Sequence, residues 1–208
     1  MRHISPGVYC RETDFPKRQN RIKHNNSKGF INIKNNSSSS EKKNNCINFE
    51  DEEVERICIE NFSINNECLT YEDAKNVLDI GTIFRNNTSI HTLTDLKYLE
   101  NLTSVTSSCF SGCSNVTDIA LPKSITSIGG ACFNNCVNLK RIMLFSQTPP
   151  RLGHEGVNDG TIMVDYLPFD IRRIKTNYIL HIFVPKGCLT IYKNNQDYRN
   201  LNIVEMYE

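Results

Sequence analysis

Four cysteines in two equally spaced pairs are the residues of this sequence best suited to chemistry. Cys109 and Cys113 form the first pair, and Cys132 and Cys136 form the second. Four thiolates can hold a zinc ion tetrahedrally, and thiols can join in disulfides in an oxidising compartment. The third interpretation is packing, because free cysteine is among the residue types most often buried.

The two segments that carry these pairs favour packing. Residues 102–121 read LTSVTSSCFSGCSNVTDIAL and residues 125–144 read ITSIGGACFNNCVNLKRIML, and the two align at a shift of 23 residues. Their apolar positions match while the polar positions vary, which is typical of a solenoid of stacked units. Each cysteine then stacks on its copy about 4.8 Å away. We therefore predict packed cysteines, with no metal and no cofactor.

The repeat extends beyond these two copies. Residues 84–99 align with the first copy at a shift of 26, so that Phe84 matches Phe110. After the second copy, two prolines break the pattern and residues 153–178 read as a long insertion. The strand pattern returns in ILHIFVPKG, and the tail LTIYKNNQDY followed by LNIVEM predicts a short helix and a last strand that close the solenoid.

A pair of helices is predicted before the repeats. Residues 52–62 place apolar side chains at three- and four-residue spacing. A second helix is expected to begin at Thr70, whose hydroxyl can cap it with Asp73 three residues on, and to continue through Leu78.

The loop between these helices, NFSINNECLTYED, resembles a degenerate EF-hand. Ser63 and Asn65 stand where acidic calcium ligands would be expected, and Cys68 lies near the glycine position. The resemblance therefore implies a helix–loop–helix that is retained while calcium binding is lost.

The charge of the chain is uneven. Residues 1–45 hold ten Lys and Arg against three Asp and Glu, so they carry +7 within a total of +1. Residues 16–45 are dense in Asn, Lys and Ser and read as a flexible linker rather than a nucleic-acid site, since they lack interleaved aromatic residues.

Other function classes are disfavoured by what the sequence lacks. No apolar run approaches the roughly 18–20 residues of a membrane span. The first residues contain no hydrophobic signal segment, so we expect no export signal and reduced thiols for the nine cysteines. None of the five histidines shares a motif with a cysteine or carboxylate, so no catalytic residue is predicted.

The repeats, with LTSVTSSCFSGCSNVTDIALP, ITSIGGACFNNCVNL and IFVPKGCLTIYKN, resemble the BspA-type leucine-rich repeats. The resemblance extends backward over INFEDEEVERICIENF, which looks like a capping segment of some gut bacterial and phage proteins. It implies an α/β fold: a short leucine-rich-repeat solenoid of parallel strands with an N-terminal helical cap and an extended N-terminal arm. It implies binding and no catalysis.

The first residues, ISPGVYCRETDF, resemble the start of phage tail-sheath and related virion proteins. The matching residues are Ser5, Pro6, Gly7, Val8, Tyr9, Glu12 and Asp14. Such an arm implies anchoring by strand addition to a neighbouring subunit. The alternative is a disordered tail whose match is due to chance. Four parts are thus expected: an extended anchor arm at 1–15, the linker at 16–45, the helical cap at 46–82, and the leucine-rich repeat domain with a C-terminal cap at 83–208.

The strand register predicts which side chains face away from the core, because successive side chains of a strand alternate. These candidate binding residues are His91, Thr92, Asp118, Lys140, Arg141, Met143, His181 and Phe183. The alternative is that they form a merely solvated face.

Two functions are expected from these resemblances. The first is a non-enzymatic phage structural protein, associated with the virion or tail and made in the host cytoplasm. Its arm would bind virion proteins, and its head would bind a host-surface protein or glycan, with no nucleic acid or membrane as partner. The second is a bacterial cell-surface or secreted leucine-rich-repeat adhesion module, which would need an export signal.

Overall fold

The computed structural model describes residues 45–153, 155–158, 163–169, 174–176 and 178–207. The predicted arm at 1–15, and all of the predicted linker except residue 45, lie outside the described residues. No helix among the described residues is long and apolar enough to cross a membrane.

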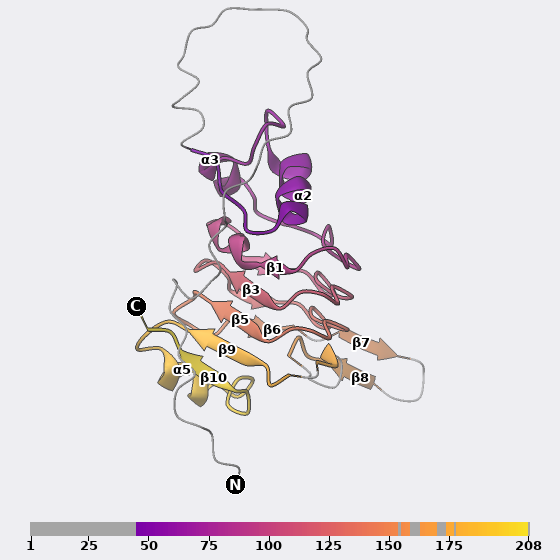
Figure 1. Ribbon diagram of the computed structural model, residues 1–208. Helices are drawn as coiled ribbons and strands as arrows, with labels where there is room; N and C mark the ends of the chain where they lie inside the picture. The colour runs from indigo at the N-terminus through magenta and orange to yellow at the C-terminus, as the bar shows by residue number, and fades with distance from the viewer. Residues whose placement is uncertain (1–44, 154, 159–162, 170–173, 177, 208) are drawn as a thin grey trace, which may run out of the picture.

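Two parallel sheets run along the stacked repeats (Figure 1). The larger sheet has the order β1 (Thr92–Leu93), β3 (Asp118–Leu121), β5 (Arg141–Leu144), β9 (His181–Val184) and β10 (Ile203–Glu205). The smaller sheet has the order β2 (Ser104–Val105), β4 (Ser127–Ile128) and β6 (Arg151–Leu152). All the pairings within these two sheets are parallel, as a leucine-rich-repeat solenoid requires.

The strand register confirms the repeat. Strand β3 pairs with β5 so that Ile119 lies beside Ile142, which is the predicted shift of 23 residues. Strand β1 pairs with β3 so that Leu93 lies beside Ile119, which is the predicted irregular shift of 26. The apolar matches found in the sequence are therefore spatial neighbours on adjacent turns.

The repeat does not break where the sequence suggested. Pro149 and Pro150 are followed by β6, which pairs with β4 so that Ile128 lies beside Leu152. That shift is one residue longer than the regular unit, which hides the match from a fixed-period comparison. The interruption follows β6 and contains an antiparallel hairpin of β7 (Glu155–Asn158) and β8 (Met163–Tyr166).

Helices α2 (Glu52–Phe62) and α3 (Tyr71–Lys75) precede the repeats. The capping box of α3 is present as predicted, because Thr70 accepts from the Asp73 N–H and the Asp73 carboxylate accepts from the Thr70 N–H. The predicted continuation to Leu78 is wrong, since α3 ends earlier and Leu78 is 66% exposed. Buried residues of both helices join the core of the repeats. Their role as a cap stays a prediction.

Short helices also follow two of the strands. The 3-10 helix η2 (Thr94–Tyr98) comes directly after β1. Helix α5 (Leu189–Asn194) follows β9, and β10 then pairs with β9 in parallel. The predicted C-terminal helix and final strand are therefore confirmed.

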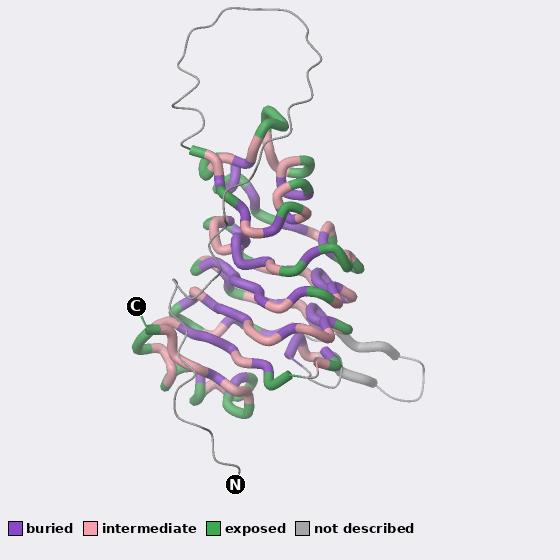
Figure 2. The backbone as a smooth tube through the Cα atoms, viewed as in Figure 1, coloured by how far each residue is buried: buried purple, intermediate pink, exposed green. Residues whose placement is uncertain are grey.

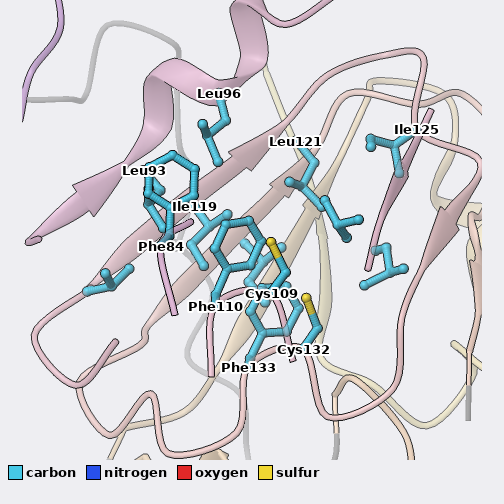
Figure 3. Close-up of a cluster of buried hydrophobic side chains, with 14 of the residues drawn as sticks. Phe84, Leu93, Leu96, Cys109, Phe110, Ile119, Leu121, Ile125, Cys132 and Phe133 are labelled. Carbon is cyan, nitrogen blue, oxygen red and sulfur yellow. The ribbon is translucent and has the colours of Figure 1, made fainter. Parts of the chain in front are cut away.

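Buried residues recur on successive turns of the solenoid (Figure 2). In the core a ladder of aromatic rings connects these turns, and Figure 3 shows its rings of Phe84, Phe110 and Phe133. The centroids of Phe84 and Phe110 are 6.1 Å apart, those of Phe110 and Phe133 are 5.6 Å apart, and those of Phe133 and Phe169 are 5.7 Å apart. The ring of Tyr198 ends the ladder edge-on at 5.8 Å from Phe169. Phe169 was not expected in this row, because it lies inside the interruption and no constant shift relates it to Phe133.

Tight turns recur at equivalent positions of successive units. Asn86, Gly112 and Asn135 all have left-handed backbone angles, with φ of 59°, 79° and 59°. Glycine adopts this conformation without strain, and asparagine tolerates it better than most residues. The residue types allowed at this position are therefore restricted, although most polar positions of the repeat vary.

Candidate binding surface

The four paired cysteines are buried, and Figure 3 shows Cys109 and Cys132 beside the rings of Phe110 and Phe133. The Cys113 thiol donates to the Phe84 carbonyl at 2.9 Å, and the Cys136 thiol donates to the Phe110 carbonyl at 3.1 Å. Burial raises the pKa of Cys113 to about 11. A hydrogen bond with Cys132, together with burial, raises the pKa of Cys109. All four thiols lie in the core, and two of them donate to backbone carbonyls, as the packing interpretation expects.

The expectation that all cysteines are reduced is wrong. Cys46 and Cys68 form a disulfide, with their Cα atoms 5.9 Å apart. The backbone brings the two together, since Cys46 forms an antiparallel bridge with Thr70 and the Ile47 N–H donates to the Leu69 carbonyl at 2.8 Å. No local pattern indicates this pairing, because Cys46 directly follows the linker and Cys68 was aligned to a calcium loop.

Polar groups of the EF-hand-like loop are used within the loop itself. The Ser63 hydroxyl hydrogen-bonds the Cys68 carbonyl at 2.6 Å and Asn65 Oδ1 at 3.0 Å. The Asp73 carboxylate caps α3. Helix, loop and helix are present as expected, and the loss of calcium binding stays a prediction.

Breaking the disulfide should loosen the segment before the repeats. We expect the Cys46→Ser, Cys68→Ser double variant to lose about 2–4 kcal/mol of unfolding free energy, because the unfolded chain gains freedom. Its melting temperature should fall accordingly in a thermal denaturation experiment, and dithiothreitol should lower that of the natural chain. Cys188→Ser is the control, since Cys188 is a free thiol. Equal melting temperatures with and without reductant would contradict the prediction.

The predicted outward-facing residues divide into two groups. The His91 side chain is 73% exposed, and Thr92, Lys140, Arg141 and His181 are half-buried. The exposure predicted for the other three is wrong, since Asp118, Met143 and Phe183 are 8%, 1% and 1% exposed.

Contacts on the sheet account for part of this burial. Met143 and Phe183 pack with Ala120 in a small apolar cluster that is separate from the main core. The Asp118 carboxylate accepts from the Arg141 guanidinium and from the Thr117 hydroxyl. The register identified the strands and the neighbours correctly, but it could not indicate how deeply these side chains are covered.

Lys140, just before β5, lies next to the end of the interruption. Lys140 Nζ lies 4.3 Å from the centroid of the Tyr178 ring, a cation–π contact. The Thr176 hydroxyl donates to the Leu139 carbonyl at 2.8 Å, which ties this segment to the start of β5. The end of the insertion therefore lies beside Lys140, as the sequence predicted.

A groove of about 390 Å³ opens beside this contact. Tyr178 and Ile179 line it and are 47% and 73% exposed, and Asn200 and Asn202 contribute amides from the chain before β10. Sequence reasoning missed this groove, because it forms where the end of the interruption meets the C-terminal tail. The one hint in the sequence was the adjacent pair of large apolar residues, Tyr178 and Ile179, at the end of the insertion.

The repeats match a known family model. Residues 80–150 match the BspA type Leucine rich repeat region, a model of six copies, which covers about a third of the chain. The segment therefore consists of leucine-rich repeats of this type, in agreement with the parallel sheets. No curated protein matches the chain.

Proposed function

We propose that this protein is a non-enzymatic binding module whose repeat domain holds a partner at the groove beside Lys140. The observation that carries this is the exposed pair Tyr178 and Ile179, set in a hollow and bordered by a cation. Aromatic and aliphatic anchors in a concave surface are the residues on which binding energy concentrates. The amides of Asn200 and Asn202 supply hydrogen-bonding groups, so a host-surface protein or glycan suits the groove.

The finer proposal is that the protein is a structural component of a phage virion, associated with the tail. Its support is the SPGVY-like start joined to a repeat head. Ser5 to Tyr9, with Glu12 and Asp14, would attach to a virion protein by strand addition, and the basic linker would let the head reach outward. The protein would be made in the host cytoplasm and act in the particle, with neither nucleic acid nor membrane as partner.

The second candidate is a bacterial cell-surface or secreted adhesion module. The Cys46–Cys68 disulfide supports it, because disulfides persist in oxidising environments outside the cytosol. A released particle meets the same environment, so the disulfide is compatible with both candidates. A peptide inventory of purified particles separates them: peptides of this chain in the particles support the virion role, and their absence contradicts it.

The groove can be tested with one charge reversal and a matched control. The labelled full chain would be titrated onto intact host bacteria and onto an array of bacterial surface glycans. We expect Lys140→Glu to weaken binding about tenfold, because the reversal removes the cation–π contact that holds Tyr178 at the groove, and losing one anchor contact costs on the order of 1–2 kcal/mol. Lys123→Glu should bind within twofold of the natural chain, because Lys123 is exposed on the turn after β3. The proposal would be overturned if the two variants bound equally well, or if the natural chain bound neither the bacteria nor the glycans.

A further inference from the structure

The large sheet ends in two edges that differ, with β1 and β10 at opposite ends of the stacked strands (Figure 1). The segment before α2 seals the β1 edge. The Asp51 carboxylate accepts from the His91 and Thr92 N–H groups at 2.7 and 3.3 Å. The Glu50 carboxylate accepts from the Thr94 hydroxyl at 2.8 Å. A further strand at β1 would have to displace these contacts.

Strand β10 forms the other edge, and its outer side is open. The Asn202 carbonyl accepts from β9 at 2.9 Å, and the Met206 N–H donates to β9 at 2.8 Å. Every second residue of 202–206 thus directs its backbone groups toward β9. Because these directions alternate along a strand, the N–H and C=O groups of Ile203 and Glu205 point away from β9. Among the described residues, none forms a hydrogen bond with these outward groups.

Groups that favour association flank the open edge. Ile191 on α5 and Tyr207 just after β10 are 46% and 43% exposed. Lys193 Nζ donates to the Leu201 carbonyl at 2.8 Å, which places a cation at the start of β10. The end of the strand carries Tyr207 and Glu205 instead. A cation at one end and an aromatic ring with a carboxylate at the other are complementary when two such strands run in opposite directions.

We propose that β10 pairs with β10 of a second copy of this chain, antiparallel and across a two-fold axis at Val204. Ile203 of each copy then lies opposite the partner's Glu205, and each such pair exchanges two backbone hydrogen bonds. Leu201 lies opposite the partner's Tyr207, so Lys193 approaches that ring. The pairing joins the two large sheets into one, and the two-fold axis makes every contact twice.

The difference between the two edges makes a second copy the fitting occupant. A sheet that is open at both edges can add copies without limit, as heterologous contacts do. Here Asp51 blocks the contact of β10 with β1 of another copy, so the pairing stops at two. Parallel pairing would place Lys193 beside the partner's Lys193. The outward backbone groups alone fit any strand, whereas the complementary ends fit a second copy.

The inference does not depend on a partner at the groove. A dimer carries two grooves, so it can hold a surface by two contacts at once. Loss of groove binding in Lys140→Glu would leave the pairing of β10 intact. A chain that stays monomeric would still hold its partner through one groove. The two proposals are therefore tested separately.

The mass of the full-length chain in solution tests the pairing. We expect light scattering to show the mass of the natural chain doubling as its concentration rises. Glu205→Pro removes one outward N–H and leaves the bonds to β9 in place, so we expect the dissociation constant of the dimer to rise about tenfold or more. The matched control Glu205→Ala keeps this N–H and loses only the side-chain contact with Gly187, so it should pair as the natural chain does. Circular dichroism would show that both variants remain folded.

A cysteine on the axis tests the register. The proposed pairing brings the two copies of Val204 together as a non-hydrogen-bonded pair, with Cα atoms about 4.5 Å apart, a separation that a disulfide spans. In a Cys188→Ser background, Val204→Cys should therefore form a covalent dimer with oxidised glutathione as the oxidant. Tyr207→Cys is the control, because the two copies of residue 207 lie about 20 Å apart in this register.

Four outcomes would overturn the proposal. A natural chain that is monomeric at every concentration would leave the edge to a strand of another protein. Equal dimerisation by Glu205→Pro would place the contact elsewhere. A covalent dimer of Tyr207→Cys without one of Val204→Cys would contradict the register. A mass that grows beyond two copies would show that the β1 edge is not sealed.

Discussion

Replacing Asp51 with alanine should detach the helical segment from the first repeat and reduce the unfolding free energy by about 3–5 kcal/mol, because backbone N–H groups of both elements would lose their charged acceptor. Oδ1 of Asp51 accepts from the Glu53 and Val54 N–H groups at 3.0 and 3.2 Å and so caps α2. Oδ2 accepts from the His91 N–H at 2.7 Å, at the entrance to β1. A single buried carboxylate therefore joins two elements 40 residues apart.

A second aspartate offers the control for this experiment. Asp73 is also buried but caps only its own helix, so Asp73→Ala should cost about 1 kcal/mol, as the loss of a local cap does. Urea denaturation gives the free energies, and amide hydrogen exchange should show faster opening of α2 in the Asp51 variant. A loss in Asp51→Ala no larger than that in Asp73→Ala would contradict a role in joining the two elements.

Removing an inner ring of the aromatic ladder should be equally severe. Phe110 is fully buried and stacks on Phe84 and Phe133. We expect Phe110→Ala to lower the unfolding free energy by about 3–5 kcal/mol, because a cavity opens between adjacent units that bury their apolar side chains against each other. Chemical denaturation measures the loss.

An exposed leucine serves as the reference for that measurement. Leu78→Ala should change stability by less than about 0.5 kcal/mol, since its side chain already lies in water. A loss below about 1 kcal/mol in Phe110→Ala would mean that adjacent units relax to fill the space, which close-packed interiors seldom do.

The regular units could be predicted from the sequence because a solenoid repeats its contacts. One shift of 23 residues places Ile119 beside Ile142, and the structure pairs them. The same reasoning failed at Phe169 and Leu152, where inserted residues change the shift while the stacking continues. A search with a fixed period finds only units of equal length. Stacking requires only that the next ring or strand reach the same position in the solenoid, whatever the number of residues between them.

The binding surface was less predictable, for a physical reason. The position of Lys140 follows from the strand register, but its contact with Tyr178 depends on how a long interruption folds back. The burial of Met143 and Phe183 depends on what covers a sheet, and alternation along a strand says only which way a side chain points. The disulfide joins residues whose proximity is set by the bridge between Cys46 and Thr70, a long-range contact.

That disulfide also determines how the molecule would carry mechanical load. A pull on the N-terminal side of the chain enters the described structure at Asn45 and reaches Cys46 at once. The covalent bond passes the tension directly to Cys68 and on to Thr70, so α2 and the Asp51 contacts lie outside the path of the force. The chain could then be pulled repeatedly without unfolding residues 47–67, and reducing the bond would put those residues in line with the load.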